Sequence, residues 1–494
     1  MKNTTIVIFG ASGDLSQRKL GPGLYSLFQK KRLPEKLNIV GYSSSKLMDG
    51  GFIERLRKGV EQFREGSLDE ETWQDFSKHL HYQSGGLTSI EDFHSLAARL
   101  KQLEAGPANR LYYLATPPQF FAEIVTCLGT IGMTDQTEGW RRVVVEKPYG
   151  TDVLSARQLN KQLRAILDEE QIYRIDHYLG KETVQNILTF RFANSFYEPI
   201  WNHNFIDHIQ ISVAEKVNLG NRAGYFDGIG TLRDMFQNHL FELLSLISME
   251  PPATFQVEDL REAKVKALHA VRPLSSQDVE VSTVRGQYKG YRNISGVAPD
   301  SNTETYAALR LYLDNPRWQE VPFYLRSGKY LAEKSTEIII QFKAMPFPIG
   351  GENRIGSMSP NILSFCLQPD EGFHQRFEVK VPDTQAETRP VEMVFHYRDA
   401  FGEATIPEAY ERLLLDALNG DASLFTRGDR AELAWELLEP VMKAWHSPNG
   451  PDLHIYEPLS WGPKAADDLI EKDGRSWLRV CGIHKADALQ PILI

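Results

Sequence analysis

A chain of 494 residues with 42% hydrophobic and 24% charged residues has an ordinary globular composition and room for two or three domains. Its formal net charge of -10 excludes general affinity for nucleic acid, so any phosphate site must be a local basic cluster. No apolar run approaches the roughly 20 residues that cross a bilayer, and the N-terminal run Ile6–Phe9 is too short for a signal peptide.

The first predicted elements are a strand, a glycine turn and a helix. Thr5–Phe9 is β-rich, Gly10–Leu15 (GASGDL) follows, and Leu20, Leu24 and Leu27 then recur with a helical period. Glycines let the backbone approach a pyrophosphate, and a helix N-terminus supplies free N–H groups, so this order is typical of nucleotide-binding units. The spacing Gly10-x-x-Gly13 departs from GxGxxG, and a plain strand-to-helix connection is the alternative.

The second predicted strand, Asn38–Tyr42, ends at the polar run Ser43–Lys46. Folds that prefer NAD usually place an Asp or Glu after this strand, where it binds the ribose hydroxyls and repels a 2′-phosphate. Three serines and a lysine stand there instead, which favours NADP. A polar loop without a ligand is the alternative.

Two further predicted strands end in candidate ligand positions. Arg110–Ala115 runs into Thr116–Pro118, and the β-branched run that begins at Arg142 stops at Lys147. Apolar strands that alternate with helical stretches indicate a parallel sheet covered on both faces, which binds ligands at the carboxyl ends of its strands. We therefore expect Gly10, the turn at 116–118 and Lys147 at one edge, although a lysine at a strand end is often only solvated.

The segment Arg174–Lys181 (RIDHYLGK) has an unusual mixture of polar side chains. A buried strand or an amphipathic helix would not contain such a set, whereas a site that binds an anion and moves a proton would. His177, Tyr178 and Lys181 can donate hydrogen bonds to a phosphate. Asp176 can hold an imidazolium.

Beyond residue 180 strand-like segments dominate, and the change of rhythm near 175–180 predicts a domain boundary. We expect an α/β Rossmann-type domain over 1–178 and a larger α+β domain with a mainly antiparallel sheet over 179–494. Strands are predicted at Ile187–Phe192, His208–Glu215, Thr305–Leu313, Thr336–Phe342, Asn361–Leu367, Phe377–Val381 and Glu392–Tyr397, and helices at about 230–248, 408–419 and 429–445.

The helix predicted at 230–248 carries Asp234 and His239. His239 borders the apolar stripe of this helix, where a structural histidine is the common alternative to a catalytic one. On a regular helix Asp234 and His239 point roughly 140° apart. Both can reach one ligand only if the ligand lies near the helix start or the helix is irregular there.

The three cysteines, Cys127, Cys366 and Cys481, are far apart and form no CxxC pair. This spacing shows no disulfide pattern and favours a reducing compartment, so we expect a cytosolic protein.

With these motifs the whole chain resembles the glucose-6-phosphate dehydrogenase family. The resemblance runs through GASGDL at 10–15 with Lys19, EKPYG at 146–150, RIDHYLGKE at 174–182, RDMFQNHL at 233–240, RSGKYL at 326–331, AYERLLLDALNGDASLF at 409–425 and SWGP at 460–463. It implies oxidation of β-D-glucose 6-phosphate to the phosphogluconolactone with hydride transfer to NADP⁺, the first step of the oxidative pentose phosphate pathway.

The resemblance also implies roles for individual residues. His239 would be the base and Asp176 the carboxylate that orients it, while His177, Tyr178 and Lys181 would hold the phosphate. Substrate positions also include Lys147, Glu215, Asp234, Lys329 and Lys334. Cofactor positions are Gly10, Ser12, Gly13, Asp14, Leu15, Lys19, Ser44, Lys46, Pro117 and Lys147. A cis bond at Lys147–Pro148 fits the family motif, and no metal site is expected.

One position departs from the family pattern. NADP-using members carry an arginine where this chain has Ser44, and a serine cannot replace the two parallel hydrogen bonds and the charge of a guanidinium. Lys46 lies two residues further on. We expect NADP⁺ with a weakened preference over NAD⁺, and an NAD-preferring enzyme is the alternative.

Two other functions are considered. One is an enzyme of the same fold acting on another aldose phosphate, and the other is a non-catalytic regulatory relative, which should have lost His239 or Asp176. The expected partners are glucose 6-phosphate and a second copy of the chain in a homodimer or homotetramer, with no nucleic acid and no membrane.

Overall fold

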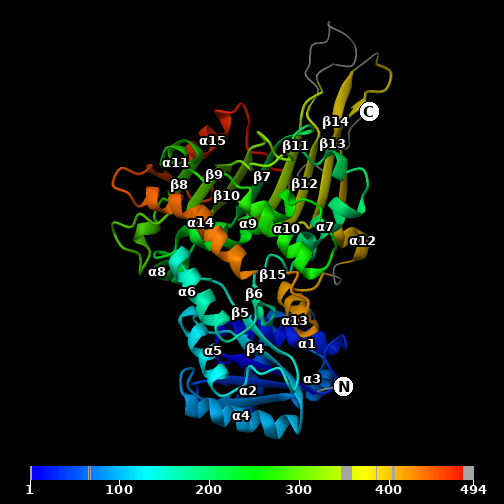
Figure 1. Cartoon of the computed structure of the whole chain (residues 1–494). Helices are drawn as coiled ribbons and strands as arrows, with labels where there is room; N and C mark the ends of the chain where they lie inside the picture. The colour runs from blue at the N-terminus through cyan, green and yellow to red at the C-terminus, as the bar shows by residue number, and fades with distance from the viewer. Residues whose placement is uncertain are drawn as a thin grey trace. The chain divides into compact units, whose positions relative to one another are not determined.

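The computed structural model describes residues 3–64, 66, 68–345, 359–384, 387–402 and 406–481 (Figure 1). The chain forms two compact units, each built on one sheet. The first unit contains Met1–Lys181, Thr254–Arg261 and Pro407–Glu432, and the second contains Glu182–Ala253, Glu262–Ile406 and Leu433–Ile494. The first unit therefore takes part of its residues from late in the chain.

The sheet of the first unit has seven strands in the order β15-β6-β5-β4-β1-β2-β3. The strands are β1 Asn3–Phe9, β2 Leu37–Ser43, β3 Leu80–Ser84, β4 Ala108–Leu114, β5 Arg141–Val145, β6 Ile172–Ile175 and β15 Phe425–Thr426. β1 to β6 pair in parallel, and β15 pairs antiparallel with β6. The parallel Rossmann-like sheet predicted from the apolar runs is confirmed.

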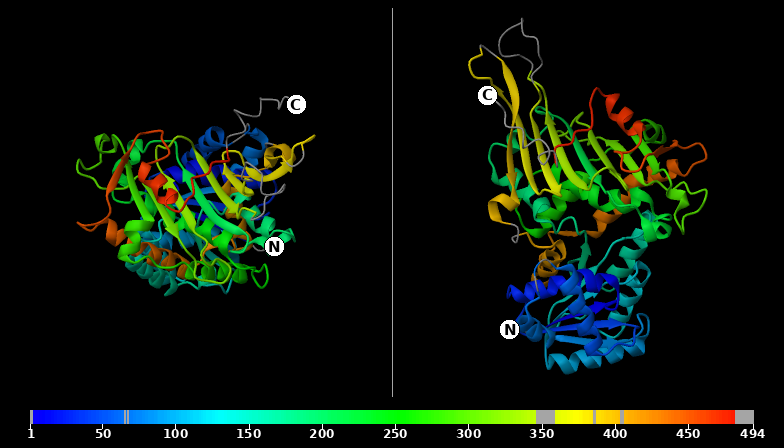
Figure 2. Two further views of the ribbon diagram at one scale, coloured as in Figure 1. Left: turned by 90° about the horizontal axis from the view of Figure 1, so that it is seen from above. Right: turned by 180° about the vertical axis from the view of Figure 1, so that it is seen from behind.

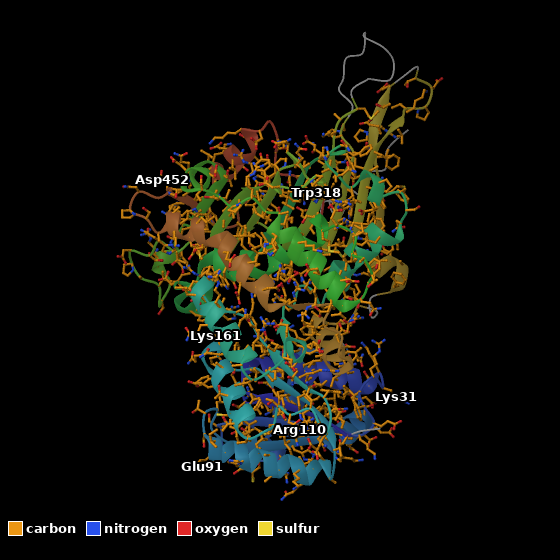
Figure 3. The ribbon with its side chains drawn as sticks, viewed as in Figure 1. Lys31, Glu91, Arg110, Lys161, Trp318 and Asp452 are labelled. Atoms are coloured by element: carbon orange, nitrogen blue, oxygen red, sulfur yellow. A yellow bond between two sulfur atoms is a disulfide. The ribbon has the colours of Figure 1, made fainter. Side chains whose placement is uncertain are left out.

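Helices pack on this sheet through apolar side chains of α4 and α5, such as Phe93, Leu96 and Ile124. At the end of α4, Glu104 pairs with Arg110 of β4, which Figure 3 labels. The helices of the first unit are η1 Ser16–Leu20, α1 Gly21–Gln29, α2 Asp49–Phe63, α3 Glu70–Ser77, α4 Ile90–Glu104, η2 Pro118–Phe120, α5 Phe121–Thr130, α6 Val153–Arg164, η3 Glu169–Gln171 and α13 Ala409–Asn419.

The sheet of the second unit has nine strands in the order β14-β13-β12-β11-β7-β10-β9-β8-β16, and the right panel of Figure 2 shows its green and yellow strands side by side. The strands are β7 Ile206–Ala214, β8 Thr283–Tyr288, β9 Tyr306–Leu311, β10 Phe323–Gly328, β11 Ser335–Phe342, β12 Ile362–Gln368, β13 Gly372–Lys380, β14 Thr388–His396 and β16 Leu453–Tyr456. Only the pairs β7–β10 and β8–β16 are parallel. The predicted α+β unit with a mainly antiparallel sheet is therefore confirmed.

Helices contact this sheet at β12 through α7 and at β10 through η6. Trp318 (Figure 3) is fully buried, and its indole N–H donates to the carbonyl of Ser248 at the end of α9. The helices that belong to this unit wholly or, for α10 and α14, in part are α7 Glu182–Ala193, η4 Glu198–Ile200, η5 Gly220–Arg222, α8 Ala223–Phe226, η6 Leu232–Leu240, α9 Phe241–Ser248, α10 Val257–His269, α11 Ser276–Ser282, η7 Tyr291–Asn293, α12 Tyr397–Phe401, α14 Gly428–Trp445 and α15 Lys464–Glu471. Among the described residues, no helix combines the length and the apolarity needed to cross a bilayer.

The strand predicted at Ile187–Phe192 is wrong, because this segment lies in the helix α7. Val184, Ile187 and Phe190 are buried at three-residue intervals, which is the spacing of one helix face. The prediction followed the apolar character of a short run, and such a run does not distinguish a buried strand from a buried helix.

The interpretation of the cysteines is also wrong. Cys366 of β12 and Cys481 form a disulfide with a Cα–Cα distance of 5.6 Å, although 115 positions separate them in the sequence. The bridge depends on the path of the C-terminal segment along the large sheet, and no local spacing encodes that path. Cys127 is a buried free thiol.

Candidate active site

Most of the predicted site residues of the first unit lie along one edge of its sheet. The strands β6, β5, β4, β1 and β2 are neighbours and run parallel, so their carboxyl ends meet at the same edge. The residues that follow these ends are Asp176–Lys181 after β6, Lys147 after β5, Pro117 after β4, Gly10–Leu15 after β1, and Ser44 and Lys46 after β2. This is the edge at which such sheets bind ligands.

The glycine turn fits closely between two neighbouring strands. Gly10 has a φ of +80°, and its N–H donates to the carbonyl of Tyr42 at 2.8 Å. A Cβ at Gly10 would lie 2.3 Å from the carbonyl oxygen of Ala115, so only glycine fits there. Gly13 closes the turn with an N–H bond to the carbonyl of Gly10. A tight turn without side chains lets a dinucleotide phosphate approach the backbone closely.

The helix after the turn begins with the π-helical segment η1 and continues as α1. Lys19 of η1 forms an ion pair with Glu408 at 2.6 Å, and Asp14 lies 3.6 Å from Arg18. Glu408 precedes α13, which lies beside α1 (Figure 1). The late segment Pro407–Glu432 therefore supports the element that carries the glycine turn.

A hydroxyl cluster lies after β2. The Oγ atoms of Ser43 and Ser45 each donate to Oγ of Ser12 at 2.9 Å, and Ser43 Oγ lies 2.6 Å from the hydroxyl of Tyr82. Burial raises the pKa of Tyr82, so this hydroxyl stays protonated. Ser44 and Lys46 are exposed beside the cluster. The structure thus joins the glycine turn to the serine run through side-chain hydrogen bonds.

Arg55 of α2 is a site candidate that the sequence analysis missed. Its guanidinium donates to the carbonyl of Gly13 at 3.3 Å, and its Nε atom is buried without a hydrogen-bond partner among the described residues. In the sequence this arginine is one of several basic residues on an amphipathic helix, beside Arg57 and Lys58. Only the packing of α2 against the turn distinguishes it.

Lys147 lies two residues after the end of β5, and its peptide bond to Pro148 is cis, as expected. The preceding residue, Glu146, accepts a hydrogen bond from the hydroxyl of Tyr113 at 2.7 Å and another from Tyr410 of α13. Burial raises the pKa of Glu146. A buried, hydrogen-bonded carboxyl group thus precedes the lysine, and α13 contributes to it.

The loop after β6 presents the candidate phosphate ligands. Asp176 is buried, and its carboxylate accepts the N–H of Tyr178 at 2.9 Å. The Lys181 ammonium lies 4.3 Å from the centre of the Tyr178 ring, and the rings of His177 and Tyr178 are 5.2 Å apart. Tyr178 therefore gathers His177 and Lys181 on one short loop.

Arg174, the first residue of the same motif, lies inside the first unit. It pairs with Glu169 at 2.5 Å and donates to Asn160 at 3.0 Å. Glu169 also accepts the N–H of Gly428. This arginine anchors the strand instead of binding a ligand.

In the second unit, three predicted substrate residues form a cluster around the buried Lys329. Lys329 follows β10 and Glu215 follows β7, and these strands are parallel neighbours. The Lys329 ammonium pairs with Glu215 and, at 2.6 Å, with Asp234. Lys334 lies outside this cluster, exposed in the turn before β11. One cation between two carboxylates offers both donors and acceptors to sugar hydroxyls.

Lys329 keeps its positive charge although its side chain is buried. Only 6% of the residue is exposed, and burial alone would lower its pKa, but Asp234 and Glu215 hold the pKa above its usual value. The ammonium is therefore charged at neutral pH.

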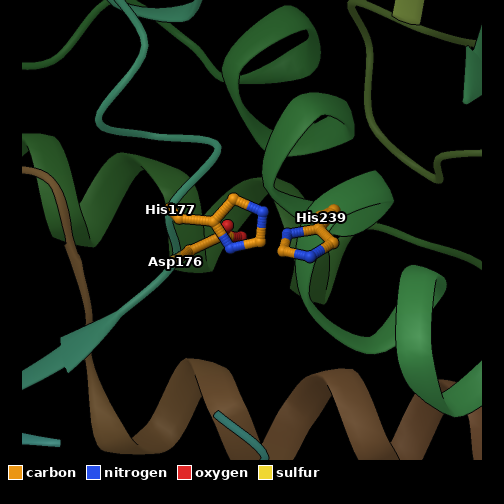
Figure 4. Close-up of side chains that lie close together, drawn as sticks. All are labelled: Asp176, His177 and His239. Atoms are coloured by element: carbon orange, nitrogen blue, oxygen red, sulfur yellow. The ribbon is translucent and has the colours of Figure 1, made fainter. Parts of the chain in front are cut away.

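Asp234 and His239 both lie on η6, which is a π-helix. Figure 4 shows Asp176 and His177 on the loop that follows β6, and His239 on η6. Hydrogen bonds in a π-helix join residues five apart, so Asp234 and His239 are one turn apart on η6. We expected Asp234 and His239 to reach one ligand only if the ligand lay near the helix start or the helix were irregular, and η6 is irregular at both residues.

Two family models match the chain. The model described as "Glucose-6-phosphate dehydrogenase, NAD binding domain" matches residues 7–186, and the model described as "Glucose-6-phosphate dehydrogenase, C-terminal domain" matches residues 188–478.

Curated relatives match over almost their whole length. The glucose-6-phosphate 1-dehydrogenase of Aggregatibacter actinomycetemcomitans is 45% identical, with 98% of this chain and 99% of the relative covered. The enzyme of the same name from Bacillus subtilis is 41% identical, with 96% of this chain and 98% of the relative covered.

Solved structures agree with these matches. A glucose-6-phosphate dehydrogenase in complex with its substrate glucose 6-phosphate is 35% identical and has a TM-score of 0.89, with 97% of this chain and 99% of that chain covered. The glucose-6-phosphate 1-dehydrogenase of Mycobacterium avium is 36% identical and has a TM-score of 0.83, with the same coverage.

Proposed function

The chain belongs to the glucose-6-phosphate dehydrogenase family, so it is an oxidoreductase that oxidises glucose 6-phosphate, and we propose that it passes the hydride to NADP⁺. The observation that carries the proposal is the match of both family models across residues 7–478. In the first unit, the candidate phosphate and cofactor residues follow the carboxyl ends of parallel strands.

The sugar phosphate is proposed to bind through His177, Tyr178 and Lys181, which the loop after β6 holds together. Histidine, tyrosine and lysine all donate hydrogen bonds, as a phosphate requires. The sugar hydroxyls are assigned to Glu215, Asp234, Lys329 and Lys334, and Lys147 is assigned to both the sugar and the cofactor.

The proton transfer is assigned to His239. An imidazole nitrogen accepts the proton of the anomeric hydroxyl while the hydride leaves the same carbon, so the sugar loses two electrons and two hydrogens and becomes the 6-phospho-lactone. Asp176 is proposed to orient this imidazole and to stabilise its protonated form. No covalent intermediate is required.

The dinucleotide is assigned to the Gly10 turn of the first unit, which follows β1 and has no room for a side chain. When bound, the nicotinamide supplies the hydride acceptor. The remaining proposed cofactor positions, from Ser12 to Lys19 and at Pro117, flank this turn or the neighbouring strand end.

The choice of NADP⁺ over NAD⁺ is supported by the carboxylates near β2. The first carboxylate after this strand is Asp49, which accepts the N–H of Tyr82 at 2.6 Å and lies 3.6 Å from Arg99. Asp49 is therefore engaged with β3 and α4. The serine run and Lys46 leave the ribose position without a competing negative charge.

The proposal is tested by His239→Asn, with the initial rate measured at saturating glucose 6-phosphate and NADP⁺. Loss of the base should reduce kcat by at least about 10²-fold. Binding of the sugar phosphate, measured by calorimetry, should be largely kept. His208→Asn is the matched control, since His208 is equally buried in the second unit. Near-normal kcat in His239→Asn would contradict the assignment of the base.

We further propose a cytosolic homodimer or homotetramer. Because Cys366 and Cys481 form a disulfide, the cysteine spacing no longer favours a reducing compartment. The proposed cytosolic location therefore rests on family membership. Self-association is supported by exposed Met393 and Val394 on β14, the last strand at one end of the large sheet. Sedimentation velocity measures the assembly directly.

A further inference from the structure

Two proposed site residues, Asp234 and His239, lie on η6, and a π-helix is a rare element in proteins. A π-helix has poorer packing than an α-helix and occurs mostly as single turns at functional sites, so its surroundings must hold it in place. Its N-terminal neighbour, Thr231, offers no side-chain capping bond. The first N–H groups of η6 therefore need acceptors from elsewhere.

Glu304, a residue of the segment before β9, supplies these acceptors. Its carboxylate accepts the N–H of Leu232 at 2.9 Å, and its backbone carbonyl accepts the N–H of Thr231 at 3.0 Å. Only 6% of Glu304 is exposed. Burial raises the pKa of Glu304, while the N–H of Leu232 and the positive end of the helix dipole favour its charged form.

Gly230 shows how closely the two segments approach. It has a φ of +76°, and a Cβ at this position would lie 2.3 Å from the Glu304 carboxylate oxygen. A side chain would therefore both strain the backbone and displace the carboxylate. The start of η6 is set by this contact.

We propose that Glu304 is a positioning residue, which holds η6 in its π-helical register and so keeps Asp234 and His239 one turn apart for the same sugar. A slip to α-helical geometry would turn one of the two side chains away. Asp234 would also leave Lys329, its ion-pair partner at 2.6 Å. The inference rests on the proposed roles of Asp234 and His239.

The test is Glu304→Leu, which keeps the side-chain size and removes the acceptor. We expect kcat/KM for glucose 6-phosphate to fall on the order of 10²-fold, the effect of a misplacement of about 1 Å. The Kd for NADP⁺ should stay at the wild-type value, because the proposed cofactor residues belong to the first unit. Glu304→Gln keeps an acceptor oxygen and should recover most of the activity.

Glu337→Leu is the matched control. Glu337 is a second buried carboxylate of the same unit and accepts the N–H groups of Val480 and Cys481, both at 3.2 Å, away from η6. Its loss should lower Tm as the loss of Glu304 does but leave kcat/KM intact. If Glu304→Leu does not fold, Gly230→Ala disturbs the same contact from the other side and should give the same kinetic loss.

Two results would overturn the inference. One is a folded Glu304→Leu enzyme with wild-type kcat/KM, and the other is an equal kinetic loss in Glu337→Leu at the same Tm. His239→Asn separates this inference from the proposed function. Loss of turnover in His239→Asn together with a fully active Glu304→Leu would reject the positioning role alone.

Discussion

Ser44 is exposed, whereas Ser43 and Ser45 on either side of it bond to Ser12. The side chain that would receive a ribose 2′-phosphate is thus free of the local hydroxyl network. Arg55, which donates to Gly13, supplies a positive charge on the same turn. The proposed preference for NADP⁺ would therefore depend on a few polar side chains and not on one arginine fork.

Ser44→Arg should strengthen the preference for NADP⁺. A charge-assisted hydrogen bond contributes about 1.5–3 kcal/mol, so the ratio of kcat/KM for NADP⁺ to that for NAD⁺ should rise about 10- to 100-fold. Parallel steady-state assays with the two cofactors measure the ratio, and Ser44→Gln is the control for a longer, uncharged side chain. An unchanged ratio in Ser44→Arg would place the 2′-phosphate elsewhere, and a wild type with equal or better kcat/KM for NAD⁺ would contradict the NADP⁺ proposal.

The sequence was sufficient to predict the residue types of the site but not their partners. Lys329 was recognised by its motif, yet its pairing with Glu215 and Asp234 depends on the parallel alignment of β7 and β10. No strand was predicted at β10, so this alignment could not be foreseen. Arg55 was missed for the same reason, since only packing separates it from its surface neighbours.

At the scale of elements, the C-terminal segment is fastened to the large sheet by charged contacts. Arg475 pairs with Asp207 at 2.8 Å, and Arg310 of β9 pairs with Asp473 at the same distance. Asp207 also accepts a hydrogen bond from His208. The two ion pairs join residues more than 150 positions apart.

Removing the Asp207 carboxylate should destabilise the second unit at neutral pH and not in acid. Burial alone would raise the pKa of Asp207, but bonds from His208 and Arg475 hold it well below the ordinary 3.8. A carboxyl with a lowered folded pKa stabilises the fold above its unfolded pKa, and this stability is lost as the pH falls through the folded pKa.

Asp207→Asn should therefore cost about 1–3 kcal/mol at pH 7, and the difference from wild type should shrink below about pH 3.8. Urea unfolding followed by tryptophan fluorescence measures this difference. A difference that stays constant down to pH 3 would contradict the role of the ionised carboxylate.

Regular periodicity predicted where an element lies but not always the geometry of its backbone. The alternation of Ile209, Ile211 and Val213 predicted β7 correctly, because one face of that strand is buried. In contrast, η6 has a regular apolar stripe in sequence but a π-helical backbone, which depends on the contact with Glu304. Local sequence carries no sign of that contact.

At the scale of the molecule, the composition of the first unit was not predictable. Chain order gives no indication that Pro407–Glu432 packs with the first 181 residues. The packing depends on side chains such as Glu411, which binds Ser26 of α1 and Lys30 just after it, and on β15 beside β6. The functional boundary between 1–178 and 179–494 remains a prediction.

The disulfide should be detectable by thiol counting. Denatured protein without reductant should show one reactive thiol, that of Cys127, and all three after reduction. Cys366→Ser should lower the free energy of unfolding by about 2–4 kcal/mol, as expected for a bridge that closes a long loop. Three reactive thiols in unreduced protein would exclude the bridge.

The ribosome synthesises α13 and β15 long after the parallel strands of the first unit, and this order affects how that unit folds. When the ribosome has released the first 181 residues, the parallel strands can pair, but Lys19, Lys30 and Arg142 still lack their acceptors on Glu408–Leu418. At about 5–20 residues per second, translation reaches that segment after tens of seconds. The nascent first unit therefore stays incomplete during this interval, with these basic side chains still without their native acceptors.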